Sequence, residues 1–297
     1  MKITKIEKKK RLYLVEIDKK ESLYVTEDTI VKYMLTKEMA LSKDQLEDIK
    51  NFAQFSHGKN LALYFISFKQ RTEKEVRDYL FKHEINPHII PQIIDNLKKD
   101  HWIDDYKLLE SLAQQNLNSG DKGAYALKQK WLQKGCEKQV IDEVLTQFDF
   151  SEVAIKVTSK LLRKYQGKLP TKSLKDKLIQ NLINKGFSFQ ESKNAINQLE
   201  LEADEENEQA LLYKEIEKQY QKFSKKYDGY ELKQHLTQSL FRKGYDFDAI
   251  ASALREYFYE FPLFSQNYDT IMKITAIVER GRHEITKRRR LYHNSKL

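Results

Sequence analysis

The chain has little of what disulfide-linked, membrane-spanning or disordered proteins need. Among its 297 residues there is one cysteine, Cys136, so no disulfide can form within the chain. No apolar run approaches the ~20 residues of a membrane-spanning helix, and the N-terminus shows no apolar signal-peptide core, so we expect a cytoplasmic protein without a membrane partner. Only nine glycines and four prolines occur beside 33% charged and 40% hydrophobic residues, which predicts a folded, helix-rich chain.

What the chain does contain is a repeated motif. Three stretches share the pattern Leu-x-Gln-x-apolar-apolar-x-Lys-Gly-apolar, and a fourth, VRDYLFKHEI at 76–85, fits it if Glu84 takes the place of the glycine. The anchor positions lie 51, 51 and 58 residues apart. This spacing predicts an array of similar repeats instead of a single core. The three clear copies are LKQKWLQKGC at 127–136, LIQNLINKGF at 178–187 and LTQSLFRKGY at 236–245.

The motif is typical of the end of an amphipathic helix. Its apolar residues recur at i, i+4 and i+5, which predicts one buried stripe per helix. The lysine suits the last turn, where a cation meets the negative end of the helix dipole, and the glycine can take the left-handed conformation that closes a helix. We therefore assign structural roles to Trp131, Gly135, Gly186 and Gly244. The predicted stripes are Leu127, Trp131 and Leu132, then Leu178, Leu182 and Ile183, then Leu236, Leu240 and Phe241.

The predicted fold class is mainly α, with tandem three-helix repeats in an elongated curved array and a small N-terminal β-containing extension. Residues 1–26 alternate between apolar and polar side chains, which predicts a small antiparallel sheet. The predicted parts are the extension at 1–58, four three-helix repeats at 59–103, 104–149, 150–200 and 201–260, and a basic tail at 261–297.

Local signals predict where individual helices begin. Asp28 is expected to cap a short helix, and Ser42 to start a longer one that ends near Phe55. The first repeat is expected to open with a separate helix at 59–70, and its third helix is expected to carry Pro87 at the first helical position.

Nothing in the sequence predicts a catalytic or cofactor site. The seven histidines lack the spacing of metal ligands, and SHGKN at 56–60 lacks the glycine spacing of a phosphate loop. Asp104 and Asp105 are adjacent, so they point apart on a helix, and Asp104 is better explained as an N-cap. Cys136 is expected to act as a small hydrophobe. We therefore expect a protein that is not an enzyme and needs no cofactor or metal.

Positive charge is unevenly placed. The net charge is +9, of which residues 150–200 carry +6 and the tail, with KRRR at 287–290, carries +5. Within the predicted helix 151–166, four cations share one face at i, i+4, i+7 and i+8, opposite an apolar face. This basic face is a candidate surface for phosphates or an acidic protein, with solvated charge as the alternative. Its cations are Lys156, Lys160, Arg163 and Lys164, and Lys168, Lys172, Lys175 and Lys177 continue the positive field.

Three segments resemble RecX, a family of bacterial regulatory proteins that modulate the RecA recombinase. QRTEKEVRDYL at 70–80 is similar to the family's opening repeat helix, WIDD at 102–105 to its repeat junction, and DKGAYALKQKWLQKGC at 121–136 to its central segment. The resemblance covers about residues 1–260, and the N-terminal extension is similar to that of low-GC Gram-positive members.

The resemblance implies a protein that binds the RecA filament on single-stranded DNA and inhibits strand exchange and ATP hydrolysis, thereby modulating DNA repair, recombination and the SOS response. Single-stranded DNA would be contacted directly or through RecA, and we expect the regulator to be a monomer. Besides the basic face, contacts are expected by position from Arg71, Arg77, Lys128, Lys130, Lys134 and Lys138.

Two other functions stay open at this point. A stand-alone nucleic-acid-binding regulator would use its repeats as helix-turn-helix-like modules and would bind DNA without a partner, with steep salt dependence. A metal-dependent hydrolase would use Asp104 and Asp105 as ligands.

Overall fold

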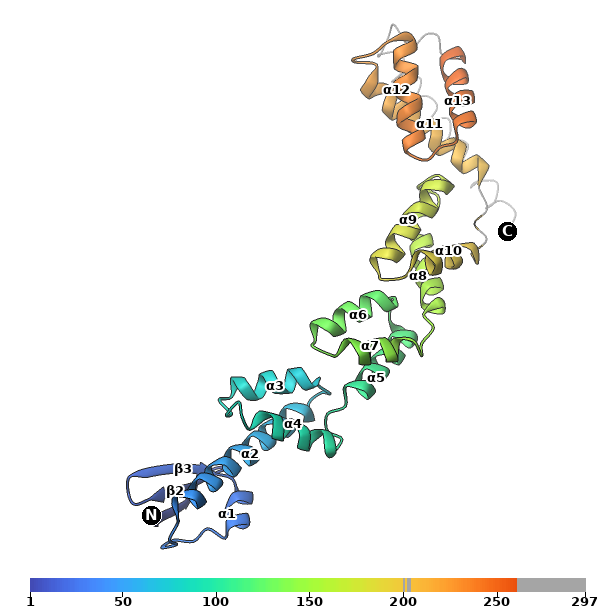
Figure 1. Ribbon diagram of the computed structural model, residues 1–297. Coiled ribbons are helices and arrows are strands. Elements are labelled where there is room, and N and C mark those ends of the chain that lie inside the picture. Colours follow the sequence, from blue (N-terminus) through green and yellow to red (C-terminus); the bar gives the residue numbers. More distant parts are fainter. Residues whose placement is uncertain (200, 202–203, 261–297) are drawn as a thin grey trace, which may run out of the picture. The chain divides into compact units, whose positions relative to one another are not determined.

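A three-stranded antiparallel sheet opens the chain, as the alternation in residues 1–26 predicts (Figure 1). The computed structural model describes residues 1–199, 201 and 204–260, and the predicted basic tail at 261–297 lies outside the described residues. The strands β1 (Ile3–Lys8), β2 (Tyr13–Ile17) and β3 (Glu21–Val25) pair in that order. The buried side chains under the sheet are Ile3, Val15, Ile17, Val25, Leu35, Leu41, Leu46, Ile49 and Ala53.

The first helix, α1 (Glu27–Tyr33), is capped by Thr26 and not by Asp28, so that prediction is wrong. Strand β3 ends one residue earlier, and the extended backbone of Thr26 lets its hydroxyl accept from the Thr29 amide at 3.4 Å. Asp28 lies in the first turn, where its carboxylate accepts a hydrogen bond from the Ser56 hydroxyl at 3.2 Å.

Helix α2 (Lys43–Ser67) is one helix of 25 residues that begins at the predicted capping box of Ser42 and Gln45. It does not end near Phe55, so the prediction of a separate helix at 59–70 is wrong. Gly58 lies inside this helix, at a position where a Cβ would lie 2.5 Å from Cδ1 of Ile93. The glycine therefore marks a close approach between helices and not a helix end.

The first repeat continues with α3 (Glu73–Lys82), which starts at a capping box formed by Thr72 and Glu75. After α3, Glu84 has a φ of 58°, so it takes the left-handed conformation that glycines take in the other copies, as predicted.

Helix α4 (Ile90–Lys99) starts three residues after Pro87, so the predicted start is wrong. The side-chain oxygen Oδ1 of Asn86 accepts from the His88 amide at 3.0 Å, and this turn occupies the positions where a first helical turn was expected. Pro91 takes the place near the helix start that Pro87 was expected to hold.

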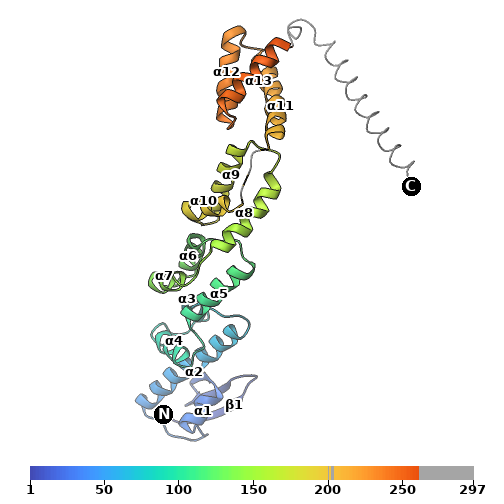
Figure 2. The same cartoon turned by 90° about the vertical axis from the view of Figure 1, so that its right-hand side faces the viewer.

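The remaining described helices fall within the predicted repeat ranges 104–149, 150–200 and 201–260. Asp104 and Ser188 cap their helices through bonds from Lys107 and Glu191 amides, at 3.0 and 3.1 Å. Figure 2 shows α11, α12 and α13 side by side around one shared core. The helices are α5 (Asp105–Ser119), α6 (Ala124–Gln133), α7 (Lys138–Leu145), α8 (Ser151–Tyr165), α9 (Thr171–Asn184), α10 (Phe189–Asn197), α11 (Glu205–Phe223), α12 (Gly229–Arg242) and α13 (Phe247–Glu260).

The described residues divide into two compact units. The first holds Met1–Leu161 and Leu178–Leu199, and the second holds Leu162–Lys177 and the described residues after 199. Helices α8 and α9 therefore contribute to both units. Among the described helices, none has a stretch that is long and apolar enough to span a membrane.

Each Lys-Gly helix end contacts the start of the second helix in the preceding repeat, and we call this contact a repeat joint. In the first joint the carbonyl oxygen of Lys134 accepts from the Thr72 hydroxyl at 3.1 Å. In the last joint, which lies within the second unit, the carbonyl oxygen of Lys243 accepts from the Ser173 hydroxyl at 2.6 Å. The carbonyls that end one helix are thus satisfied by the preceding repeat.

In the middle joint the helix end is bound through backbone hydrogen bonds. The carbonyl oxygens of Lys185 and Gly186 accept from the amides of Gly123 and Tyr125, at 2.9 and 3.1 Å. Gly186 has a φ of 89°, and a Cβ there would lie 2.3 Å from the amide nitrogen of Ala126. Glycine is therefore required at this position for two reasons: the left-handed backbone conformation, and the close approach of the neighbouring repeat.

The predicted buried stripes are only partly correct. The first two members of each stripe are buried, but the third members, Leu132, Ile183 and Phe241, are 37, 39 and 51% exposed. A helix that packs against its repeat on one side buries i and i+4, whereas i+5 is turned about 100° further toward solvent.

Replacing Gly186 by Ala should lower the free energy of unfolding of its unit by more than the same change at Gly167 lowers that of the second unit. Gly167 has a φ of 72° with no atom within 4 Å of an added Cβ, so Gly167→Ala should cost about 1–2 kcal/mol of backbone strain. Gly186→Ala adds a clash with the Ala126 backbone, for a further ~1–3 kcal/mol. Thermal unfolding and hydrogen exchange of both variants measure the difference. Equal losses in the two variants would contradict the role of the joint.

Candidate functional site

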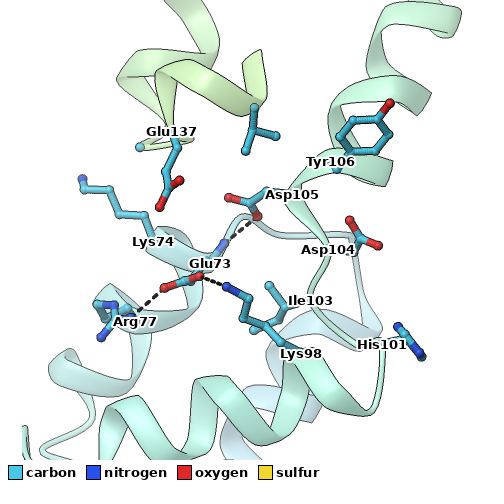
Figure 3. A pocket seen from close by; sticks show the side chains of 12 residues that line it. Glu73, Lys74, Arg77, Lys98, His101, Ile103, Asp104, Asp105, Tyr106 and Glu137 are labelled. Carbon is cyan, nitrogen blue, oxygen red and sulfur yellow. Dashed lines mark hydrogen bonds and ion pairs between the residues drawn. The ribbon is translucent and has the colours of Figure 1, made fainter. Parts of the chain in front are cut away.

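A cleft of about 480 Å³ lies at the first repeat joint, between α3, α4 and the start of α5 (Figure 3). Its charged groups bind one another. The Glu73 carboxylate accepts from Arg77 at 2.7 Å and from Lys98 at 2.9 Å. Asp105 accepts from the backbone amide of Glu73 at 2.9 Å, so the start of α5 is tied to the start of α3. The cleft is therefore a polar seam that connects two repeats.

The ion pairs of the seam shift the pKa values of their members. Burial raises the pKa of the Glu73 carboxyl, but hydrogen bonds from Lys98 and Arg77 lower it by more, so that the net pKa lies below its usual value. The hydrogen bond to Glu73 likewise raises the pKa of the Lys98 ammonium. Both groups are charged at neutral pH and hold α3 against α4.

Asp105 is shifted in the opposite direction. Burial raises the pKa of its carboxyl, and the hydrogen bond from the Glu73 amide offsets only part of that shift. A carboxylate with a raised pKa in the folded state opposes folding when it is ionised.

The described residues offer no support for metal or nucleophilic chemistry. In Figure 3 the carboxylates of Asp104 and Asp105 point in different directions, because one caps α5 and the other binds α3. No group of three or more His, Cys, Asp or Glu side chains in the described part could hold a metal ion. Cys136 is buried, as predicted, and burial raises the pKa of its thiol to about 11, so the reactive thiolate is scarce at neutral pH.

The candidate contact residues of the first two repeats are not gathered into one patch. Lys130 and Lys138 are exposed. Each of the other four residues lies against a group of the same chain. Arg71 lies 4.2 Å from the Phe65 ring, and Arg77 binds Glu73. Lys128 binds Asp142, and Lys134 lies 3.9 Å from Glu75. Their positive charge is partly neutralised within the repeats.

The basic face of α8 matches its sequence pattern. Lys156, Lys160, Arg163 and Lys164 are all exposed along one helix. On the other side of α8, Val153, Ala154 and Val157 are buried, whereas Leu161 and Tyr165 are half-buried. The helix thus uses one side for packing and leaves four cations to solvent.

The further lysines of the positive field are also exposed. The Lys168 ammonium donates to the carbonyl oxygen of Lys164 at 2.8 Å, and the Lys172 ammonium lies 5.5 Å from the Phe241 ring. Lys175 and Lys177 are exposed on α9.

Sequence reasoning missed the repeat joints. The signal was present, because Asp121 lies just ahead of α6 and pairs with Lys185 of the motif, and the small residues Thr72, Gly123 and Ser173 stand near the starts of the second helices. A hydroxyl or a bare amide at these positions can reach a neighbouring helix end, whereas a large side chain could not.

The described residues define a helical protein of tandem three-helix repeats, with a polar seam at a repeat joint and an exposed basic face on α8. Two family models match the chain: the first three-helix domain of RecX at residues 59–97 and the third three-helix domain of RecX at residues 205–254.

Similarity to individual proteins extends over most of the chain. A "Regulatory protein RecX" of Streptococcus sanguinis (strain SK36) is 63% identical over 257 residues, which cover 86% of this chain and 100% of the relative. One of Streptococcus mutans is 62% identical over the same share of each. A crystal structure of regulatory protein RecX is similar in fold, with a TM-score of 0.55 and 29% identity over 66% of this chain and 98% of that chain. The chain belongs to the RecX family.

Replacing Asp105 by Asn should leave the chain as stable or more stable at neutral pH. The amide oxygen of Asn can still accept from the Glu73 amide, while the buried charge is gone. The pKa of Asp105 in the folded state is raised. The difference in the free energy of unfolding between the variant and the wild type should therefore shrink as pH falls through that pKa, because the wild-type carboxyl becomes neutral. Denaturant unfolding between pH 7 and pH 4 measures both effects. Asp104→Asn, which keeps the N-cap, is the control. A variant whose advantage persists unchanged at acidic pH would contradict this account.

Proposed function

We propose that this chain is a non-enzymatic regulator that binds the RecA filament on single-stranded DNA and inhibits ATP turnover and strand exchange, modulating DNA repair and recombination. Its membership of the RecX family, whose matched relatives carry the name "Regulatory protein RecX", supports a regulatory role. The observation that carries the proposal for this chain is the exposed basic face of α8.

The basic face suits phosphates better than a protein pocket. Its four cations lie along about two helical turns, and no acidic side chain lies between them on the helix. Each phosphate neutralised on a single strand contributes to a salt-dependent affinity with a slope of about 0.7 per contact. Lysines and arginines that are already exposed reach phosphates without breaking a packed contact.

The repeats suit a polymeric partner. We propose that the parts 59–103, 104–149, 150–200 and 201–260 act as successive contact modules of one monomer, with 1–58 as an added N-terminal module. Linked weak contacts to a repeating partner gain affinity through effective concentration. Within this proposal Lys130 and Lys138 of the second repeat are exposed and contribute contacts directly, whereas Arg71, Arg77, Lys128 and Lys134 must share their charge with groups in the chain.

A stand-alone nucleic-acid-binding regulator is the second candidate, because the same basic face would bind DNA without RecA. The two functions differ in one measurable respect. DNA affinity of the purified chain should rise strongly when RecA coats the strand if RecA is the partner, and should fall through competition for the strand if it is not.

Reversing three charges on α8 should release RecA from inhibition. We expect Lys156→Glu/Lys160→Glu/Arg163→Glu to raise the half-inhibiting concentration in RecA ATP turnover on single-stranded DNA by at least about tenfold, since about three phosphate contacts are lost. The matched control is Lys214→Glu/Lys218→Glu/Lys225→Glu, which changes the net charge equally at exposed lysines of α11 and its end. Thermal unfolding checks that both variants fold. Inhibition that is unchanged in the α8 variant, or lost equally in the control, would contradict the proposal.

A further inference from the structure

The Lys-Gly motif contains positions that folding explains and positions that it does not. The leucine and the first apolar residue of each copy are buried, as are the residues after the glycines. These side chains fill the core of their repeat, and the glycine with its preceding carbonyl makes the joint. Packing therefore accounts for most of the motif.

The second apolar residue, three positions before the glycine or Glu84, is exposed in every copy. It is Phe81 in α3, Leu132 in α6, Ile183 in α9 and Phe241 in α12, with exposed fractions of 68, 37, 39 and 51%. We call these four residues the exposed apolar set. Although Lys172 lies 5.5 Å from the Phe241 ring, half of that side chain is open to solvent.

A single exposed apolar residue needs no explanation, because much of any protein surface is apolar. The exposed apolar set differs in that the same position of four helices carries a large apolar side chain, although the repeats diverge at most other surface positions. The residue that follows it is Lys82, Gln133, Asn184 or Arg242, polar in every copy and exposed. Burial within the repeat accounts for only part of each side chain, so the exposed part is available for contact with another molecule.

The surroundings of the set indicate a protein partner. One turn before the apolar residue, α6, α9 and α12 carry exposed glutamines, Gln129, Gln180 and Gln238. An amide can both donate to and accept from a peptide group, whereas phosphates call for cations. Leu132 and Ile183 have no aromatic face on which a base could stack, so an apolar side chain and not an aromatic ring is what the four positions share. Third-helix starts add exposed Phe189 and Phe247, 59 and 57% open, in two of the repeats.

We propose that Phe81, Leu132, Ile183 and Phe241 contact the protein subunits of a helical polymer, one apolar contact for each repeat, while the basic face of α8 contacts its nucleic acid. This inference rests on the proposed function, because the polymer is the filament named there. In this proposal the apolar side chains and their neighbouring amides bind protein, whereas the cations bind phosphates. Linking four weak contacts makes their binding strong without a deep pocket on either molecule.

The test replaces the whole set and measures two affinities separately. The variant is Phe81→Gln/Leu132→Gln/Ile183→Gln/Phe241→Gln. Its matched control is Val31→Gln/Phe68→Gln/Trp102→Gln/Tyr230→Gln, which removes four apolar side chains that are 68, 69, 54 and 84% exposed at other positions. The control should unfold at nearly the wild-type temperature, because its four side chains are mostly exposed. The set variant loses partly buried contacts at Leu132 and Ile183, so its thermal unfolding is measured to check that it folds. Binding is measured to RecA filaments on single-stranded DNA and, separately, to the bare strand.

We expect the set variant to bind filaments at least about tenfold more weakly, since a few apolar anchors carry most of an interface's affinity, and to bind bare DNA like the wild type. The control should keep both affinities. Wild-type-like filament binding by the set variant would overturn this inference but leave the proposed function standing. Failure of the wild-type chain to bind filaments would contradict the proposed function itself.

Two further outcomes would also overturn the inference. Equal loss of filament and bare-DNA binding would mean that the set contacts nucleic acid. A change from dimer to monomer by light scattering, with filament binding kept, would mean that the set joins two copies of this chain. Single substitutions supply an independent check, because each should weaken filament binding by a similar factor if every repeat contributes one contact.

Discussion

The structure depends on the close approach of one helix end to the start of the second helix in the preceding repeat. At the middle joint this approach is between backbones, with two amide-to-carbonyl bonds of 2.9 and 3.1 Å, and there is no room for a side chain on Gly186. At the outer joints a threonine or serine hydroxyl supplies the bond. A three-helix repeat is small, so its stability depends on what its neighbours contribute. The recurrence of Lys-Gly follows from that dependence.

The joints also decide which cations are left for binding. Lys134 and Lys185 belong to the motif but lie against Glu75 and Asp121 of the preceding repeat. They serve the joints, and so do Arg77 and Lys98 in the seam. The cations of α8 have no such task, because that helix packs through Val153, Ala154 and Val157 on its other side. Structural and binding charges are thereby separated along the chain.

Much of the fold could be predicted because it depends on local sequence patterns. Caps such as Ser42, Thr72 and Ser188 and the repeated helix ends depend on neighbours within a few residues. The wrong predictions concern features that depend on contacts between residues far apart in the sequence. A helix end was predicted near Phe55, yet the helix continues through Gly58, which packs against Ile93. The exposure of Leu132 depends on how far α6 is turned within its repeat. The basic face was predictable from spacing alone, whereas the pairing of Lys128 with Asp142 required the packed helices.

The central claim is that these repeats present two chemically different surfaces to one polymer, cations to nucleic acid and exposed apolar side chains to protein. Site-specific photo-crosslinking tests it most directly, with the crosslinking residue placed at Lys160 of α8 in one sample and at Ile183 of α9 in another, each bound to a RecA filament on single-stranded DNA. The account predicts that Lys160 captures the DNA strand and Ile183 captures the RecA protein. Capture of the same component from both positions, or the reverse assignment, would contradict it.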